Sequence, residues 1–215
     1  MSTQAATANP QHETVFIVDD DASIGEGLSN LLESVGLNAE HYLSAEDFLA
    51  HWSSARPGCL VLDVRLPGMT GVEFQEKMRQ SGIEIPIIFM TAHGDIPMVR
   101  KVMRAGAVEF LTKPFEAQEL LHAIEYALAN DRARRKEQTE LNSIRASIDS
   151  LTPREREVMA LVTAGLLNKQ IAAELGLSEI TVKLHRRHVL EKMQADSLAD
   201  LVKMTEKIRT AQPRQ

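Results

Sequence analysis

Between residues 14 and 130, short apolar runs alternate with segments whose apolar residues recur at helical spacing, and this alternation strongly constrains the fold. Strands that alternate with helices predict βαβ units, right-handed crossovers and a parallel sheet covered on both faces. The predicted strands lie at 15–18, 39–43, 59–62, 85–90 and 108–111. The predicted helices lie at 24–35, 45–52, 72–81 and 98–104, and the last begins near 116.

Polar side chains directly follow four of the five predicted strands. Asp19 and Asp20 follow the first strand, Asp63 the third, Thr91 the fourth and Lys113 the fifth. Because ligand chemistry in open α/β sheets sits outside the carboxyl ends of the strands, we expect these residues to converge on one edge. Aspartates also commonly cap the helix that follows a strand, and Asp21 is interpreted as such a cap only.

This set of side chains predicts a site for a phosphoryl group. Three neighbouring carboxylates repel and raise one another's pKa unless a cation joins them. Carboxylate oxygens are the ligands that Mg²⁺ prefers, with the remaining positions left to water and substrate oxygens. Lys113 and the Thr91 hydroxyl can bind the other oxygens of an incoming anion. We therefore predict Mg²⁺ as the cofactor and one aspartate as the carrier of the phosphoryl group.

Residues 14–130 resemble the receiver domain of two-component response regulators. The resemblance rests on Asp19-Asp20, on Asp63 with Leu66-Pro67-Gly68-Met69 and Gly71, on Thr91-Ala92, on Phe110 and on Lys113-Pro114. It implies a flavodoxin-like (βα)5 fold, sheet order 2-1-3-4-5, and a cis Lys113–Pro114 bond. Asp63 would be the phosphoacceptor, assisted by Lys113, and Thr91 and Phe110 would be the switch residues.

The same resemblance implies the metal ligands and two further residues at the site. Mg²⁺ would be held by Asp20, Asp63 and the backbone carbonyl of Arg65, with Asp19 completing the acidic pair. Arg65 and His93 lie two residues past Asp63 and Thr91, and we predict that they set the lifetime of the phosphoryl group. The alternative for His93 is a solvent-exposed loop residue.

Residues 131–149 are predicted to form a helical linker, because this charged segment contains neither Gly nor Pro. A sparse apolar stripe of Leu141, Ile144 and Ile148 is predicted on one face of the helix. The four basic residues between 132 and 136 are interpreted as a solvated helix face, with contact to DNA as the alternative.

Residues 150–210 contain the signals of a small helical domain. Thr152, Pro153 and Glu155 predict an N-cap, a first-turn proline and a capping box, and Gly165 ends the helix. A short helix at 168–175, a turn at 176–178 and a third helix that ends near 193 then match the helix-turn-helix pattern. A fourth helix is predicted at 198–208.

The third helix has an apolar face and an outward face. Val182, Val189 and Met193 share the predicted core face. The outward set comprises Lys183, Leu184 and Arg187, which are expected to reach base edges in the DNA major groove. Thr181, Asn168 and Lys169 are predicted to contact phosphates because they lie near helix starts. Arg186 is predicted to pair with Glu155.

The segment 151–193 closely resembles the LuxR-type helix-turn-helix of response regulators, without a gap. A plain helical bundle is the alternative that the periodicity alone leaves open. The resemblance places the chain in the NarL/FixJ family, nearest the FixJ branch, because of the run Thr91-Ala92-His93-Gly94-Asp95 and the later Pro97.

Charge and composition fit this division. Residues 1–130 hold 8 Lys+Arg and 18 Asp+Glu, a net charge of −10, whereas residues 131–215 hold 16 and 12, a net of +4. The split suggests an acidic module joined to one that meets an anionic partner. Cys59 is the only cysteine, which excludes an internal disulfide. With no apolar block in residues 1–13, predicted to be a disordered tail, we expect a soluble cytoplasmic protein.

These observations predict a transcription regulator that is controlled by phosphorylation and is not an enzyme acting on a separate substrate. The expected partners are a sensor histidine kinase, double-stranded promoter DNA, a second copy of the chain and, as a further candidate, RNA polymerase. The resemblance implies that dimerisation uses the surface of the fourth helix, fifth strand and fifth helix.

Two alternative functions compete with this prediction. An aspartate-nucleophile phosphatase of the haloacid dehalogenase type needs a second acid two residues after the nucleophile, where this chain has Arg65. A receiver governed by protein contacts or concentration rather than by phosphorylation is the second alternative.

Overall fold

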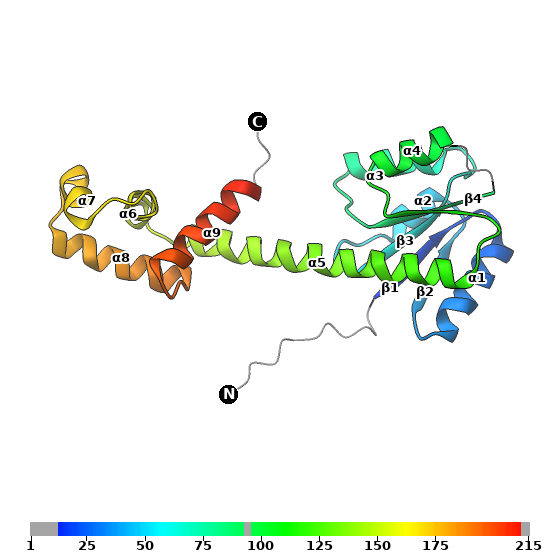
Figure 1. The fold of residues 1–215 in the computed structure, drawn as a ribbon, viewed down its shortest axis with the longest axis horizontal. Coiled ribbons are helices and arrows are strands. Elements are labelled where there is room, and N and C mark those ends of the chain that lie inside the picture. Colours follow the sequence, from blue (N-terminus) through cyan, green and yellow to red (C-terminus); the bar gives the residue numbers. More distant parts are fainter. Residues whose placement is uncertain (1–12, 93–95, 212–215) are drawn as a thin grey trace. The chain divides into compact units, whose positions relative to one another are not determined.

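The computed structural model describes residues 13–92 and 96–211, which belong to two compact units, residues 1–134 and residues 135–215. The first unit contains a five-stranded parallel sheet of order β2-β1-β3-β4-β5, which confirms the predicted topology (Figure 1). The second unit is helical in the described residues. No helix in the described part of the chain has the length and apolarity needed to cross a membrane.

The elements of the first unit follow the predicted alternation. Its strands are β1 (Thr14–Val18), β2 (Asn38–Tyr42), β3 (Gly58–Asp63), β4 (Ile87–Thr91) and β5 (Glu109–Thr112). Its helices are α1 (Ala22–Ser34), α2 (Ala45–His51), α3 (Gly71–Gln80) and α4 (Ile96–Arg104), followed by the start of α5 (Ala117–Asp149). Most predicted boundaries are within about two residues, although Trp52 lies just beyond α2 rather than inside it.

Alternate residues of the buried strands face two separate cores, as expected for a sheet covered on both sides. Phe16, Leu60 and Phe89 pack with α2, α3 and α4 on one face. Val15, Val61 and Ile88 pack with α1 and the first part of α5 on the other. The helices therefore fix the sheet rigidly and leave its carboxyl edge to carry functional groups.

The start of the predicted linker is tied to the sheet rather than solvated. Asp131 is 1% exposed, and its carboxylate accepts hydrogen bonds from the Gly58 backbone N–H at 3.0 Å and from Arg134 Nη2 at 2.5 Å. Arg132 Nη1 lies 2.7 Å from the buried carboxylate of Glu13. The interpretation of the four basic residues as a solvated face holds for Arg132 and Lys136, which are exposed, whereas Arg134 and Arg135 are half-buried. Of the predicted tail, 1–12 lie outside the described residues.

The second unit consists of the rest of α5 with α6 (Pro153–Thr163), α7 (Asn168–Leu175), α8 (Glu179–Met193) and α9 (Leu198–Ala211). Its core contains Val158, Ile171, Val182 and Val189, which confirms the predicted inward face of α8. Leu141 and Ile144 of α5 are both 6% exposed, and Ile144 belongs to this same core, so the predicted apolar stripe is buried.

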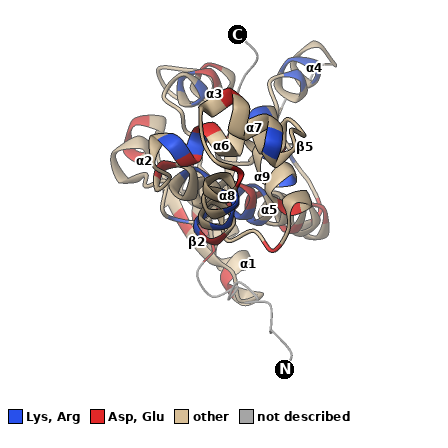
Figure 2. Ribbon diagram, turned by 90° about the vertical axis from the view of Figure 1, so that its left-hand side faces the viewer, with Lys and Arg blue, Asp and Glu red and all other residues tan. Residues whose placement is uncertain are grey.

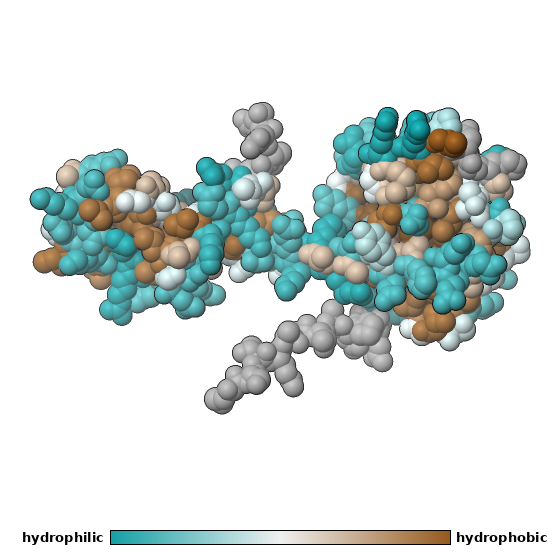
Figure 3. Space-filling model, viewed as in Figure 1, coloured by the Kyte–Doolittle hydropathy of each residue, from teal (hydrophilic) through white to brown (hydrophobic). Residues whose placement is uncertain are grey.

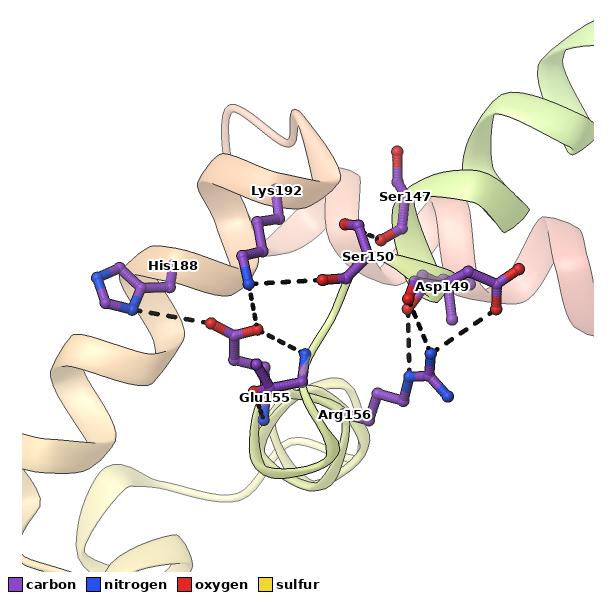
Figure 4. A network of polar contacts seen from close by, with 9 residues as sticks. Ser147, Asp149, Ser150, Glu155, Arg156, His188 and Lys192 are labelled. Atoms are coloured by element: carbon purple, nitrogen blue, oxygen red, sulfur yellow. Dashed lines mark hydrogen bonds and ion pairs between the residues drawn. The ribbon is translucent and has the colours of Figure 1, made fainter.

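A polar network joins α5, α6 and α8 within the second unit (Figure 4). The buried Glu155 carboxylate accepts a hydrogen bond from Lys192 Nζ at 2.7 Å and another from the Thr152 backbone N–H, which confirms the predicted capping box. Arg156 donates to the backbone carbonyls of Ile148 and Asp149, near the end of α5. These contacts satisfy helix-terminal groups that would otherwise lack partners.

The predicted pairing of Arg186 with Glu155 is wrong. Glu155 interacts with Lys192 and lies 3.8 Å from His188 Nδ1, and both of these residues are on α8. Arg186 instead donates to the Asn168 side chain at the start of α7. The way α6 packs against α8 decides which cation reaches Glu155. The spacing of residues along one helix does not give this packing.

Candidate functional site

Four neighbouring strands bring the predicted site residues to one edge of the sheet. Asp19 follows β1, Asp63 ends β3, Thr91 ends β4 and Lys113 follows β5, and these strands are adjacent in the order β1-β3-β4-β5. The predicted convergence is therefore correct for all four. Asp21 accepts from the Ser23 backbone N–H and caps α1, as expected.

The carboxylates of Asp19, Asp20 and Asp63 form an acidic cluster, with one oxygen of each within 4.8 Å of the others. Asp19 is 1% exposed and Asp63 is 9% exposed, whereas Asp20 is open to solvent. Lys113 Nζ donates to Asp19 Oδ2 at 2.6 Å and lies 3.7 Å from Asp63 Oδ2. Lys113 is thus shared between two carboxylates, one of which is the predicted phosphoacceptor.

Electrostatics at this cluster favour a cation beside Asp63. Burial raises the pKa of the Asp63 carboxyl, and the Asp19 carboxylate raises it further. Lys113 and the backbone amides of Arg65 and Val64 oppose this rise. Asp19 is held by hydrogen bonds from Lys113 and from the Asp21 amide, whereas Asp20 is exposed and is the carboxylate most open to an added ion. A cluster of hard oxygen ligands of this kind fits Mg²⁺.

The predicted switch residues occupy distinct environments. Thr91 is fully buried at the end of β4, and its backbone carbonyl accepts from the Lys113 amide at 2.7 Å. Phe110, on β5, is half-buried and packs against the core that faces α2, α3 and α4. The peptide bond between Lys113 and Pro114 is cis, as the resemblance implied. Arg65 is exposed beside the cluster, whereas His93 lies outside the described residues.

Close packing at Gly71 fixes the loop that follows Asp63. A Cβ atom on Gly71 would lie 2.5 Å from the Asp63 backbone carbonyl and 3.1 Å from Phe89 Cε1. The Gly71 amide donates to the Val64 carbonyl at 2.8 Å. Only a residue without a side chain lets α3 begin this close to the end of β3, so Gly71 serves to shape the acidic pocket.

The outward face of α8 is the second candidate site. Lys183, Leu184 and Arg187 are all exposed, which agrees with their predicted orientation. Arg187 Nε donates to Glu191 Oε1 at 2.7 Å, one turn further along the helix. This bond uses Nε, so the two terminal nitrogens of the guanidinium remain able to donate to a base edge.

A groove of ≈ 660 Å³ runs beside this face, and its lining combines three cationic side chains with the acidic Glu191 and Asp196. Its lining includes Lys183, Arg186, Arg187 and Asn168. Arg186 Nη1 donates to Asn168 Oδ1 at 2.5 Å, and Lys169 beside it is exposed. Thr181 contacts the cap residue Ser178 through their hydroxyls. The arrangement suits an anionic backbone that passes the start of α7.

Positive charge is local rather than spread evenly over the chain. Lys and Arg residues lie among Asp and Glu residues on the helices (Figure 2). In the groove beside α8, three cations outnumber the two acidic residues of the lining. The prediction from sequence omits Ile180 and Glu191, which also lie on this face of α8. Helical spacing could have found them, because Ile180 is three residues before Lys183 and Glu191 is four residues after Arg187.

Comparison with known families finds one match within each of the two compact units. The response regulator receiver domain family matches residues 15–125. The luxR family of bacterial regulatory proteins matches residues 149–205. The two matches cover the acidic pocket and the α8 face respectively.

Individual relatives match across both regions. Nodulation protein W of Bradyrhizobium diazoefficiens is 51% identical over 192 residues, which cover 89% of this chain and 85% of that protein. The transcriptional regulatory protein FixJ of Rhizobium meliloti is 44% identical over 191 residues, covering 89% and 94%. The solved structure of the response regulator StyR has a TM-score of 0.83 and 50% identity, covering 91% and 99%.

Proposed function

Because this chain belongs to the NarL/FixJ family of two-component response regulators, we propose that a sensor histidine kinase phosphorylates it on Asp63 and so controls its binding to promoter DNA. The observation that carries the proposal is the convergence of Asp19, Asp20, Asp63 and Lys113 at one sheet edge. The second unit supplies an output, since its luxR family match includes the whole of α8.

The acidic cluster fits a bound Mg²⁺, and Asp20, Asp63 and the backbone carbonyl of Arg65 would hold it, with Asp19 alongside. When bound, the ion would neutralise charge on the oxygens of the transferred phosphoryl group. Asp19 also keeps Lys113 in place through the 2.6 Å hydrogen bond. From there the ammonium group can donate to a phosphoryl oxygen, because it already lies 3.7 Å from Asp63 Oδ2.

The reaction proposed for this pocket is a direct phosphoryl transfer. A carboxylate oxygen of Asp63 attacks the phosphorus of a phosphohistidine on the kinase, the P–N bond breaks and a P–O bond forms. The histidine nitrogen leaves with the bonding electron pair. Thr91 then donates its hydroxyl to the new anion, and Phe110 repacks in response. Water later hydrolyses the acyl phosphate at a rate that Arg65 and His93 influence.

The output proposed is dimerisation through α4, β5 and α5. Apolar side chains on these elements reach solvent, including Ile96 at 71% and Tyr126 at 61% exposure. A groove of ≈ 400 Å³ there is lined by Phe110, His122 and Tyr126 among others, so repacking of Phe110 changes this surface directly. Two paired copies place two α8 helices on two half-sites and gain affinity through effective concentration.

The test is a phosphorylation experiment with a matched control. Wild-type protein, Asp63→Asn and Asp21→Asn are each incubated with Mg²⁺ and acetyl phosphate, and intact mass and oligomeric state are measured. Wild type and Asp21→Asn should gain one phosphoryl group and form dimers, because Asp21 only caps α1. Asp63→Asn should do neither. Equal phosphorylation of Asp63→Asn would refute the assignment, and dimers without phosphorylation would favour control by concentration or protein contacts.

A further inference from the structure

The outward face of α8 carries more than the three residues named above. Ile180, Lys183, Leu184 and Arg187 are spaced at i, i+3, i+4 and i+7. At 3.6 residues per turn these positions fall within about 100° of the helix circumference. The core residues of α8 lie on the opposite side of the helix. Ile180 therefore belongs to the same continuous stripe as the predicted base-contacting residues.

Ile180 is unusually exposed for its type. It is 79% exposed, the highest value among the large apolar side chains in the part of the chain that the structure describes, and Leu184 is 51% exposed. Apolar side chains also reach the surface elsewhere on both units (Figure 3). Ile180 differs in its position one helical turn before Leu184, on a stripe that also carries the cations Lys183 and Arg187. The fold of the second unit does not bury the Ile180 side chain, so its apolar surface is free to contact a ligand.

The charges beside the stripe identify the ligand class. Lys183 and Arg187 lie along one side of the two apolar side chains, and both cations also line the adjoining groove. A ligand that presents anionic groups next to apolar groups fits double-stranded DNA entered from the major groove. There the apolar group that a side chain can meet is the C5-methyl of thymine.

Resting on the proposed DNA binding, we infer that Ile180 and Leu184 form an apolar pair that reads two thymine methyl groups in each half-site. Side chains four residues apart on a helix are about 5–6 Å apart at Cβ, and successive base pairs rise about 3.4 Å. The two methyl groups therefore lie within about two base pairs of each other. Arg187, oriented through its Nε by Glu191, reads a guanine beside them.

The experiment tests which single side chain is needed for sensitivity to which single thymine methyl group. Full-length protein, with and without acetyl phosphate and Mg²⁺, selects sites from a randomised duplex library. Affinities are then measured for the selected duplex and for versions in which each thymine is replaced singly by deoxyuridine, which lacks only the methyl group. Wild type, Ile180→Ala and Leu184→Ala are compared. Leu167→Ala is the control, because Leu167 is 69% exposed but precedes α7.

Wild-type affinity should fall about fourfold for each of two thymines, which corresponds to ~0.8 kcal/mol for one methyl-sized apolar group. Ile180→Ala should become insensitive to one methyl group and keep its sensitivity to the other, and Leu184→Ala should show the reverse. Leu167→Ala should retain both. Circular dichroism should show unchanged folding, since both positions are exposed helical sites.

Two results would overturn the inference, and a third would overturn its premise. Unchanged methyl sensitivity in Ile180→Ala would show that this side chain does not reach a thymine. Sensitivity at no thymine in wild type would show that the stripe does not read methyl groups and would favour a protein partner there. Failure of wild type to select any sequence, with or without phosphodonor, would refute the proposed DNA binding itself.

Discussion

Replacing Asp131 by alanine should destabilise the first unit far more than its place in a charged helix suggests. The substitution leaves the buried Gly58 N–H without its carboxylate acceptor at 3.0 Å, a loss of about 1–3 kcal/mol. It also removes one partner of Arg134, which keeps Glu84 at 3.4 Å, and this adds up to about 1 kcal/mol. The higher helix propensity of alanine stabilises the unit by roughly 0.5 kcal/mol and partly offsets this loss. Together these contributions give an expected net loss of about 2 kcal/mol, within a range of roughly 0.5–3.5 kcal/mol.

Tryptophan fluorescence during urea unfolding measures this loss in the correct unit. Trp52 is the only tryptophan, and its ring centroid lies 5.6 Å from that of Phe16 and 5.5 Å from that of Phe48, in the first unit's core. With an m-value of about 1.5 kcal/mol/M, a loss of about 2 kcal/mol should lower the urea midpoint by roughly 1.3 M.

Glu84→Ala is the matched control, because Glu84 contacts the same arginine from an exposed position and its loss should stay within about 0.5 kcal/mol. If Asp131→Ala shifted the midpoint no further than Glu84→Ala, the buried bond to β3 would not stabilise the unit.

Further substitutions probe the pocket, the polar network and the α8 face. Gly71→Ala should lower the stability of the first unit by about 1–3 kcal/mol and slow phosphorylation, because its Cβ would lie 2.5 Å from the Asp63 carbonyl oxygen. Gly27→Ala is the control and should have neither effect, because the space around Gly27 is open. Lys192 and the Thr152 amide lower the pKa of Glu155 to about 2, from 4.5. Its contribution to stability is thus complete above about pH 4.5 and is lost as the pH falls toward 2. Thermal melts of residues 135–215 should therefore show a lower Tm for Glu155→Gln at neutral pH, and the two proteins should converge in acid. Arg187→Ala should relax specificity at one base pair by about 1–3 kcal/mol, whereas Lys169→Ala should weaken binding to all sequences alike in salt-dependent affinity measurements.

The periodicity of the sequence is enough to predict a parallel sheet and the edge at which the site forms. The order of the strands follows from the family resemblance. Strand ends are encoded locally, because an apolar run that stops at Asp63 or at Lys113 marks the point directly. Parallel topology then brings such ends together without further information. The acidic pocket was accordingly predictable residue by residue.

Long-range pairings were not predictable in this way. Nothing in the charged run 130–138 marks Asp131 as a buried residue, because its burial depends on the Gly58 amide 73 residues earlier. Glu155 was assigned the wrong cation, because the choice between Arg186 and Lys192 depends on how α6 crosses α8. Ile180 was overlooked for a different reason: an apolar residue near a helix start resembles a core residue until its exposure is measured.

The dependence of DNA affinity on Asp63 tests the central claim most directly. Binding to a selected duplex is measured by fluorescence anisotropy for wild type and Asp63→Asn, each with and without acetyl phosphate in the presence of Mg²⁺. The account predicts that acetyl phosphate tightens wild-type binding by about 5- to 150-fold, as expected for allosteric coupling, and leaves Asp63→Asn unchanged. Equal affinity of wild type in both conditions, or the same increase in Asp63→Asn, would contradict it.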